Sequence, residues 1–248
     1  MTVMVELDHL SRSFGDLRAV DDISLTVNKG EVLGFLGPNG AGKTTTMRML
    51  AGFLKPSAGT ARVCGHDILT DGMQAKRMLG YLPEGSPTYD EMTVAAFLNF
   101  IAAVRGYAGA EAKTRVESVV QRLALAEVLD RPIELLSKGY RRRVGLAQSI
   151  LHDPPVLLLD EPTDGLDPNQ KHEVRTLIKA MAQEKAIIIS THILEEVEAV
   201  CTRAVIIGRG KLLADGTAEQ LRARLPGGGS LDDVFRFITT GAAPQAAA

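Results

Sequence analysis

The chain has 248 residues, of which 45% are hydrophobic and 23% are charged, and its formal net charge is −2. A chain of this length and composition buries its own core, as one domain or as one domain with a lobe. The charge balance excludes a general basic field that would draw the chain to nucleic acid or anionic lipid. The two cysteines are far apart in sequence and exclude a disulfide framework. We expect no secretory signal, and the most apolar helical stretch, Val94 to Val104, is too short to span a bilayer.

The N-terminal part of the chain is predicted to form an antiparallel sheet. Two segments, residues 3–16 and 19–31, alternate apolar and polar side chains and contain turn residues. The next run, Val32 to Leu36, is apolar throughout, which indicates a strand buried on both faces, as in a parallel sheet. A helix over Lys43 to Gly52 is expected to follow it.

Between this strand and this helix the sequence reads GPNGAGKTT, which fits the phosphate-binding pattern G-x-x-x-x-G-K-[ST]. Its glycines let backbone N–H groups turn inward, so that these groups and the helix N-terminus hold the β-phosphate of a nucleotide. Lys43 is expected to reach the β- and γ-phosphates, and the Thr44 hydroxyl to bind Mg²⁺. The alternative is a glycine-rich turn with a chance lysine, which the flanking strand and helix disfavour. The predicted nucleotide-binding residues are Gly37, Pro38, Asn39, Gly40, Ala41, Gly42, Lys43, Thr44 and Thr45.

The segment from Thr93 to Glu127 is predicted to be mostly helical, with breaks at Gly106 and Gly109. It separates two core strands, so we expect it to belong to a helical lobe that covers about residues 85–155.

A second possible phosphate site lies in LSKGYRRRV, which begins a helix predicted over Ser137 to Leu151. Ser137 suits the N-cap position, where its hydroxyl and the following N–H groups would hold an anion. From this stretch alone, a simple capped helix is an equally good interpretation. The arginines at 141–143 point about 100° apart on a helix, so we expect a solvated helix start with one of them turned inward.

Apolar strands and helical segments then alternate, which indicates a layered α/β domain. One strand ends in VLLLDEP, where Asp160 would hold Mg²⁺ through water and Glu161 would orient or deprotonate the attacking water. A solvated acidic loop is the alternative. The expected strands are Val156–Asp160, Ala186–Ser190 and Ala204–Gly208, and the expected helices are Asn169–Gln183 and Ile193–Val200.

The end of the chain is predicted to be separate from the main domain of residues 1–224. LPGGGS, residues 225–230, is typical of a flexible joint, and LDDVFRFI after it is a short amphipathic segment. The last residues, GAAPQAAA, carry no structural signal and are expected to be disordered.

Taken in order, these motifs resemble those of the ATP-binding subunit of an ABC transporter, over nearly the whole chain. GPNGAGKTT matches the P-loop, LSKGY the signature motif in a divergent form, and VLLLDE the Walker B strand with its catalytic glutamate. GLDP, residues 165–168, matches the D-loop that contains Asp167, and STH ends in the switch histidine, His192. Phe14 stands where the family places an aromatic that stacks on adenine.

The resemblance implies that two copies of the chain pair head to tail around ATP and Mg²⁺. Ser137 and Gly139 of one copy would bind the γ-phosphate held by Lys43 of the other. His192 would contact the γ-phosphate and support hydrolysis, whereas a helix-start histidine without a ligand is the alternative. ATP would join the two copies, and its hydrolysis would release them.

Three residues depart from the family pattern. The usual signature has glycine in place of Lys138 and glutamine in place of Tyr140, and many members have a glutamine where Glu84 stands. In the family that glutamine binds Mg²⁺ and senses the membrane partner, and a glutamate also offers an oxygen ligand. Lys138 would either strengthen phosphate binding or point to solvent. This pattern is similar to exporters of the ABC-2 type, and within them to the gliding-motility group.

The resemblance implies a cytoplasmic subunit, peripheral on the inner face of the cell membrane, that powers integral membrane permease subunits. Thr93–Val104 and the loop containing Glu84 would form the docking face. Two other functions remain open: a non-transport ABC ATPase that acts on nucleic acid or the ribosome, and a regulatory subunit without turnover. Because the chain has neither a heptad run nor a basic excess, we expect no nucleic-acid partner. The transported substrate is not encoded in these motifs.

Overall fold

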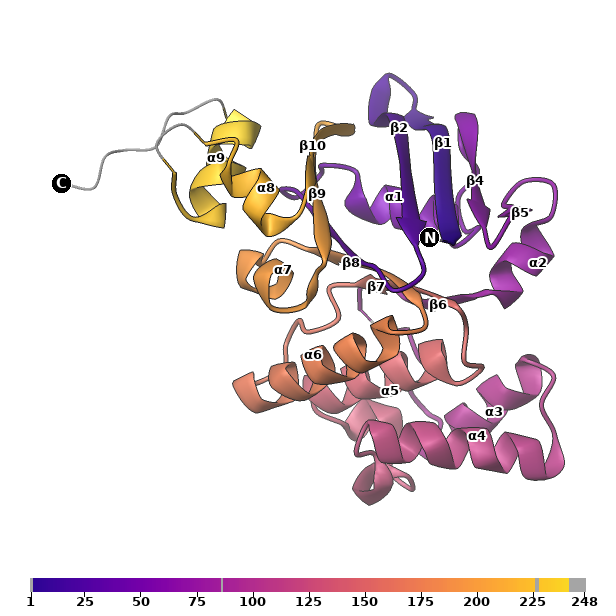
Figure 1. Cartoon of the computed structure of the whole chain (residues 1–248). Helices are drawn as coiled ribbons and strands as arrows, with labels where there is room; N and C mark the ends of the chain where they lie inside the picture. The colour runs from indigo at the N-terminus through magenta and orange to yellow at the C-terminus, as the bar shows by residue number, and fades with distance from the viewer. Residues whose placement is uncertain (1, 86, 226–227, 241–248) are drawn as a thin grey trace.

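The computed structural model describes residues 2–85, 87–225 and 228–240, which build two sheets and a set of flanking helices (Figure 1). The strands are β1 (Val3–Phe14), β2 (Leu17–Asn28), β3 (Val32–Leu36), β4 (Ala58–Val63), β5 (His66–Asp67), β6 (Leu79–Leu82), β7 (Val156–Asp160), β8 (Ala186–Thr191), β9 (Arg203–Gly208) and β10 (Lys211–Gly216). The helices are α1 (Lys43–Leu50), α2 (Gly72–Arg77), α3 (Val94–Val104), α4 (Gly109–Arg122), α5 (Lys138–Ile150), α6 (Pro168–Ala182), α7 (Leu194–Val200), α8 (Ala218–Arg222) and α9 (Leu231–Thr240).

The two sheets confirm the expected fold class. The N-terminal sheet has the order β2-β1-β4-β5, and its neighbouring strands are antiparallel. The second sheet has the order β10-β9-β3-β8-β7-β6, in which every neighbouring pair is parallel except β9 and β10. Since β3 lies between β8 and β9, the loop after β3 opens beside the ends of the strands that carry the other predicted site residues.

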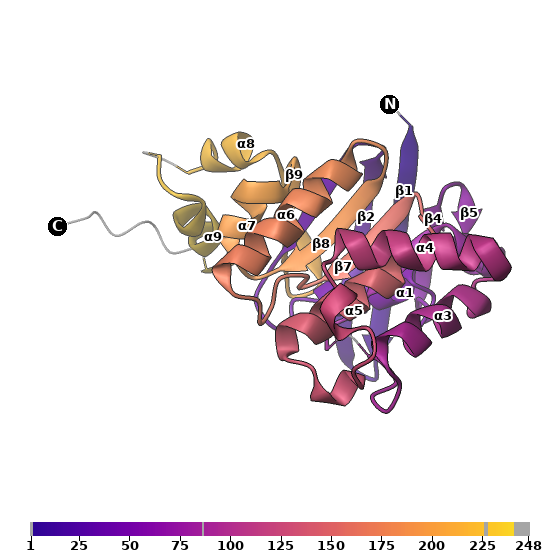
Figure 2. The same ribbon diagram turned by 90° about the horizontal axis from the view of Figure 1, so that it is seen from below.

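The central strands are buried on both faces, as their unbroken apolar sequences predicted. In β7, Val156 and Leu158 pack with the antiparallel sheet and α1, whereas Leu157 and Leu159 pack on the opposite side with helices. Figure 2 shows those helices, α3 to α6, lying over one side of the six-stranded sheet. Two apolar layers therefore hold the sheet, and polar groups gather only where its strands end.

The four predicted strands and the predicted helices are all present, with ends that differ by two residues or fewer at the helix termini. The breaks expected near Gly106 and Gly109 separate α3 from α4. Four strands were not expected from the sequence: β4 and β5 of the N-terminal sheet, β6 at one edge of the six-stranded sheet, and β10 at the other. No helix in the described ranges is both long enough and apolar enough to span a bilayer.

The C-terminal segment forms the amphipathic helix α9, as expected. Leu231 and Val234 of this helix are buried in a cluster with Ile206 of β9 and Leu221 of α8. The division at residue 224 stays a prediction, as do the limits of the helical lobe. Pro226 and Gly227 of the predicted joint, and the last eight residues predicted to be disordered, lie outside the described residues.

Candidate functional site

The loop between β3 and α1 has the backbone geometry that the GPNGAGKTT pattern predicts. Gly42, at the N-cap of α1, has φ 105°, and a Cβ there would lie 2.4 Å from the carbonyl oxygen of Ala19. Only glycine fits this position without strain. The Lys43 side chain is almost fully buried, and its Nζ donates to the carbonyl oxygens of Gly37 at 2.6 Å and Pro38 at 3.1 Å. The ammonium is therefore held inside the curve of the loop.

A cavity of about 430 Å³ lies against this loop. It joins the P-loop to residues that come from distant parts of the chain, since Phe14, Glu84, Asp160 and Glu161 all line it. Phe14 is 46% exposed and so does not belong to the core, and the Arg12 guanidinium lies 4.6 Å from its ring centre. The remaining lining residues are Leu17, Ala19, Asn39, Gly40, Ala41, Gly42, Lys43, Thr44 and Thr45.

Two acidic residues occupy the C-terminal end of β7. Asp160 is 2% exposed and accepts a hydrogen bond from the Ser190 hydroxyl through Oδ1, while its Oδ2 is buried without a hydrogen-bond partner in the described part of the chain. Such an unpaired buried oxygen is uncommon and suits a cation. Glu161 has φ 50°, and its Oε1 lies 2.8 Å from Nδ1 of His192. The turn after β7 thus presents Glu161 to the histidine that follows β8.

The cavity joins one buried cation to three carboxylates. Burial lowers the pKa of Lys43, and the negative charges of Glu161, Asp160 and Glu84 oppose this effect. An anion bound beside Lys43 would keep its ammonium charged. The site therefore has the charge pattern of a pocket that takes an anionic ligand together with a metal cation.

Ser137 and its neighbours form a second cluster, which does not line this cavity. Ser137 caps α5, since its hydroxyl accepts a hydrogen bond from the N–H of Tyr140 at 3.3 Å. Lys138 forms an ion pair with Asp164, with 2.8 Å between Nζ and Oδ2. The Lys138 side chain thus lies against the loop that leads to the D-loop, and it lowers the pKa of Asp164.

The D-loop meets the start of α5 in the same cluster. Asp167 caps α6 by accepting a hydrogen bond from the N–H of Gln170 at 2.9 Å. A Cβ at Gly139 would lie 2.6 Å from Oε1 of Gln170, so the glycine allows this close contact. The structure therefore brings Ser137, Gly139 and Asp167 together, but not with the P-loop of the same chain.

Two inward-facing arginines correct the expectation that only one of residues 141–143 turns inward. Arg142 is 6% exposed and donates to the carbonyl oxygen of Pro83 at 3.1 Å, and also to the carbonyl oxygens of Asp160 and Glu161. Arg143 is also buried, and its Nη2 lies 2.8 Å from a carboxylate oxygen of Glu173.

The sequence signal for this arrangement was the apolar stripe of α5. Leu146, Ala147 and Ile150 are buried, and counting back three or four residues from them reaches positions 142 and 143. Sequence reasoning missed Arg142 as a functional residue because an arginine triplet usually indicates a solvated surface. One guanidinium connects the signature helix to the acidic end of β7 and to the residue before Glu84.

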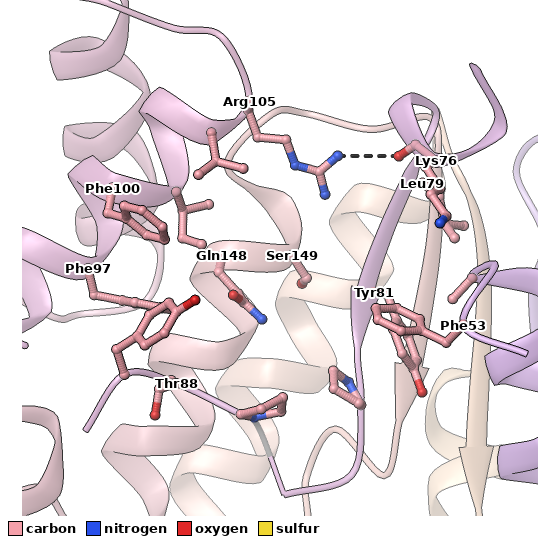
Figure 3. A pocket seen from close by; sticks show the side chains of 16 residues that line it. Phe53, Lys76, Leu79, Tyr81, Thr88, Phe97, Phe100, Arg105, Gln148 and Ser149 are labelled. Carbon is pink, nitrogen blue, oxygen red and sulfur yellow. Dashed lines mark hydrogen bonds between the residues drawn. The ribbon is translucent and has the colours of Figure 1, made fainter. Parts of the chain in front are cut away.

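A separate groove of about 690 Å³ lies between α3 and the sheet (Figure 3). Phe97 and Phe100 line one side of it and Phe53 and Tyr81 the other, with Gln148 and Ser149 of α5 between them. The charged lining residues are Lys76 and Arg105, both basic.

The loop after β6 connects the groove with the nucleotide cavity. Pro83 lines the groove, and the next residue, Glu84, lines the cavity that contains Lys43. A movement of this loop would therefore change the lining of both the groove and the nucleotide cavity.

Comparison with known proteins agrees with this geometry. The family model described as "ABC transporter" matches residues 20–164. The chain is 39% identical to the ABC transporter ATP-binding protein NatA of Bacillus subtilis (strain 168) over 224 residues, which is 88% of this chain and 91% of NatA. It is 35% identical to the daunorubicin/doxorubicin resistance ATP-binding protein DrrA of Streptomyces peucetius over 225 residues, covering 90% of this chain and 68% of DrrA.

A solved structure described as the ATP-binding subunit of an ABC transporter superposes with a TM-score of 0.87 at 29% sequence identity, covering 95% of this chain and 99% of that one. The order of the motifs, the cavity at the P-loop and these similarities all lead to one assignment. The chain belongs to the ABC transporter family, as an ATP-binding and ATP-hydrolysing subunit that works with membrane permease partners.

Proposed function

We propose that this chain powers a membrane exporter by hydrolysing ATP at sites shared between two copies of itself. The observation that carries the proposal is the separation of two phosphate-binding helix starts, because the P-loop lines the nucleotide cavity and Ser137 does not. In a head-to-tail pair, Ser137 and Gly139 of one copy bind the γ-phosphate held by Lys43 of the other. Asp167 lies beside them and faces the same ATP. ATP joins the copies, and loss of its γ-phosphate releases them.

The residues present also fit a magnesium ion bound with the ATP. Thr44, Glu84 and Asp160 bring one hydroxyl and two carboxylates to one cavity, and these are the oxygen ligands that Mg²⁺ prefers. The unpaired Oδ2 of Asp160 supports this assignment. A bound Mg²⁺ would neutralise charge on the phosphates.

Glu161 acts as the base or orienting group for the attacking water, and His192 contacts the γ-phosphate. The 2.8 Å approach of the two side chains supports a shared role. Lys43 stabilises charge on the phosphates, and Phe14 stacks on the adenine from the far end of the cavity. The exposed ring of Phe14, which lines that cavity, supports the stacking role.

The groove in Figure 3 is the docking site for a cytoplasmic segment of the permease. It is lined by aromatic side chains, of which Phe53 is 75% and Tyr89 55% exposed, and such a patch is typical of a protein interface. Lys76 and Arg105 favour a segment that carries an acidic residue. The shared loop at Pro83 and Glu84 would transmit the state of the nucleotide to that segment. The chain then works at the inner face of the cell membrane, as a peripheral subunit.

The direction of transport is export. DrrA is named for drug resistance, and the divergent LSKGY signature is similar to that of ABC-2-type exporters. Assignment to the gliding-motility group remains a prediction. A non-transport ABC ATPase that acts on nucleic acid or the ribosome is less well supported, because the relatives described above are named transporter or resistance subunits.

The test is the mass of the Glu161→Gln variant in saturating Mg-ATP. This variant binds ATP but does not hydrolyse it, so light scattering should give twice the 26.6 kDa mass of one chain. Adding Lys43→Ala as a control removes ATP binding and should return the mass to that of a single chain. A Glu161→Gln chain that is saturated with nucleotide yet stays monomeric would contradict the shared site.

Steady-state release of phosphate by the wild-type chain separates this proposal from the regulatory alternative. Turnover that disappears in Glu161→Gln supports a working ATPase. ATP binding without any turnover, in the chain bound to its permease, would favour a regulatory subunit.

A further inference from the structure

Glu196 on α7 has a buried carboxylate and has no role in the proposed binding or hydrolysis of ATP. It is 4% exposed, and no ion pair involves it within the described ranges. Its carboxylate accepts hydrogen bonds from two threonine hydroxyls, Thr163 through Oε1 and Thr191 through Oε2, the second at 2.8 Å. Removing an acid from water without an ionic partner is unfavourable, and burial raises the pKa of Glu196. A buried carboxylate without an ion pair lowers the stability of the fold, which suggests that Glu196 has a function.

The two threonines belong to the two turns that carry the proposed catalytic pair. Thr163 comes two residues after Glu161, and Thr191 directly precedes His192. Both threonines are almost fully buried. The Thr191 hydroxyl also accepts a hydrogen bond from the N–H of Ile193 at 3.0 Å, so it shapes the turn around His192.

The sheet alone does not fix these turns. Strands β7 and β8 are paired as far as Asp160 and Ser190, and one more backbone bond joins the Glu161 N–H to the Ser190 carbonyl at 3.0 Å. Beyond these residues β7 and β8 no longer pair with each other, although Thr191 still pairs with Leu36 of β3. Glu196 joins them again, with one carboxylate oxygen on each turn.

Thr163 also begins the loop that leads to the D-loop. Its carbonyl oxygen accepts a hydrogen bond from the N–H of Leu166 at 3.2 Å, and Asp167 follows directly. The carboxylate of Glu196 therefore links three features: the turn of Glu161, the turn of His192, and the loop expected to face the second copy.

We infer that Glu196 is a positioning residue for ATP hydrolysis, which holds Glu161 and His192 at their reacting distance and fixes the D-loop relative to them. This inference rests on the proposed roles of Glu161 and His192. Glu196 acts through Thr163 and Thr191 and does not line the nucleotide cavity. Its loss should slow the chemical step and leave nucleotide binding at Lys43 intact.

The test compares Glu196→Gln with Glu195→Gln in the full chain. The substituted glutamine side chain keeps the shape of the glutamate but replaces one acceptor oxygen with an NH₂ donor. One of the two threonine hydroxyls therefore loses its acceptor and has to turn and accept from the amide, which weakens the connection between the two turns. Glu195 is the adjacent residue on α7 and is exposed, so Glu195→Gln is a control that makes the same change of charge on the same helix. We expect Glu196→Gln to lower kcat by about 10- to 100-fold, because small displacements of reacting groups have effects of that size. The Kd for ATP should change by less than about threefold, and Glu195→Gln should behave as wild type.

Two further measurements separate positioning from general loss of structure. In the His192→Ala background, Glu196→Gln should lower kcat by less than about threefold, because Glu196 no longer has the His192 ring to position. Thr191→Val should lower kcat, and Thr191→Ser, which keeps the hydroxyl, should restore it.

A readout that does not depend on turnover keeps the inference testable if the isolated chain hydrolyses ATP slowly. The ring resonances of His192 in NMR spectra, assigned with His192→Gln, should shift in Glu196→Gln and stay in place in Glu195→Gln. The inference is overturned if these resonances do not move, or if kcat, the Kd for ATP and Tm all worsen together. If instead Glu161→Gln keeps full turnover, the proposed function fails, and that result is distinct from either of these.

Discussion

The guanidinium of Arg142 offers the most direct test of how the signature helix supports the nucleotide site. Arg142→Met keeps the apolar stem, which packs in the buried face of α5, and removes the donors that reach the carbonyl oxygens of Pro83, Asp160 and Glu161. Each buried carbonyl that loses its partner costs about 1 kcal/mol or more. Removing a buried charge offsets part of that cost.

Three such carbonyls give a loss of stability of about 3 kcal/mol. For a chain of this size that corresponds to a Tm lower by about 6–12 °C. Circular dichroism during heating measures this change in Tm. Phosphate release in the same preparation should also fall, because the backbone carbonyls of Asp160 and Glu161 lose their contact with the guanidinium.

The matched control is Arg141→Met, one residue earlier on the same helix. Arg141 is exposed, so its substitution should leave Tm within about 2 °C of wild type. If Arg142→Met has as small an effect, or if Arg141→Met has as large a one, then the carbonyl contacts do not support the site and the reasoning is wrong.

Two other predictions follow from the backbone of the P-loop and from a half-buried histidine. Gly42→Ala should abolish ATP binding measured by calorimetry, because its Cβ would meet a backbone oxygen at 2.4 Å, whereas Gly40→Ala has the same sign of φ with nothing within 4 Å and should weaken binding only mildly. Burial lowers the pKa of His152 to about 4, so the unfolded chain binds a proton below pH 6.5 that the folded chain does not, and stability should fall as the pH drops from 6.5 to 4. Urea unfolding across that range should show a smaller fall in His152→Gln, while His172→Gln, at an exposed position, should match wild type.

The sequence predicted the core strands and the nucleotide pocket because both depend on local signals. A strand buried on both faces must be apolar at every position, as Val156 to Leu159 are, and a phosphate loop needs its glycines and lysine at fixed spacing. The edge strands β6 and β10 were missed for the opposite reason. LGYL is only four residues long and contains a glycine, and KLLADG alternates neither apolar nor polar residues regularly. Neither strand therefore has a pattern of its own, and each is fixed by its neighbour.

The site residues that could not be predicted act through the backbone or through other side chains. Arg142 binds carbonyl oxygens of residues up to 59 positions away, and Glu196 joins threonines from two separate turns. Pairings of this kind depend on how the strands are ordered in the sheet, and no spacing in the sequence carries that order. Lys138 is a similar case, because its ion pair with Asp164 needs α5 and the D-loop to lie together.

The apolar layer shared by the helices and the sheet limits how this chain could recombine with its relatives. Phe97 and Leu98 of α3 belong to one continuous cluster with Leu159 of β7 and Ile189 of β8. A chimera that exchanged only residues 85–155 would cut that cluster along its length, and mismatched volumes at the join cost about 1–3 kcal/mol each. A chimera that folds would have to include β7 and β8 together with the helices. The helices taken from a relative would then pack against the strands with which they evolved.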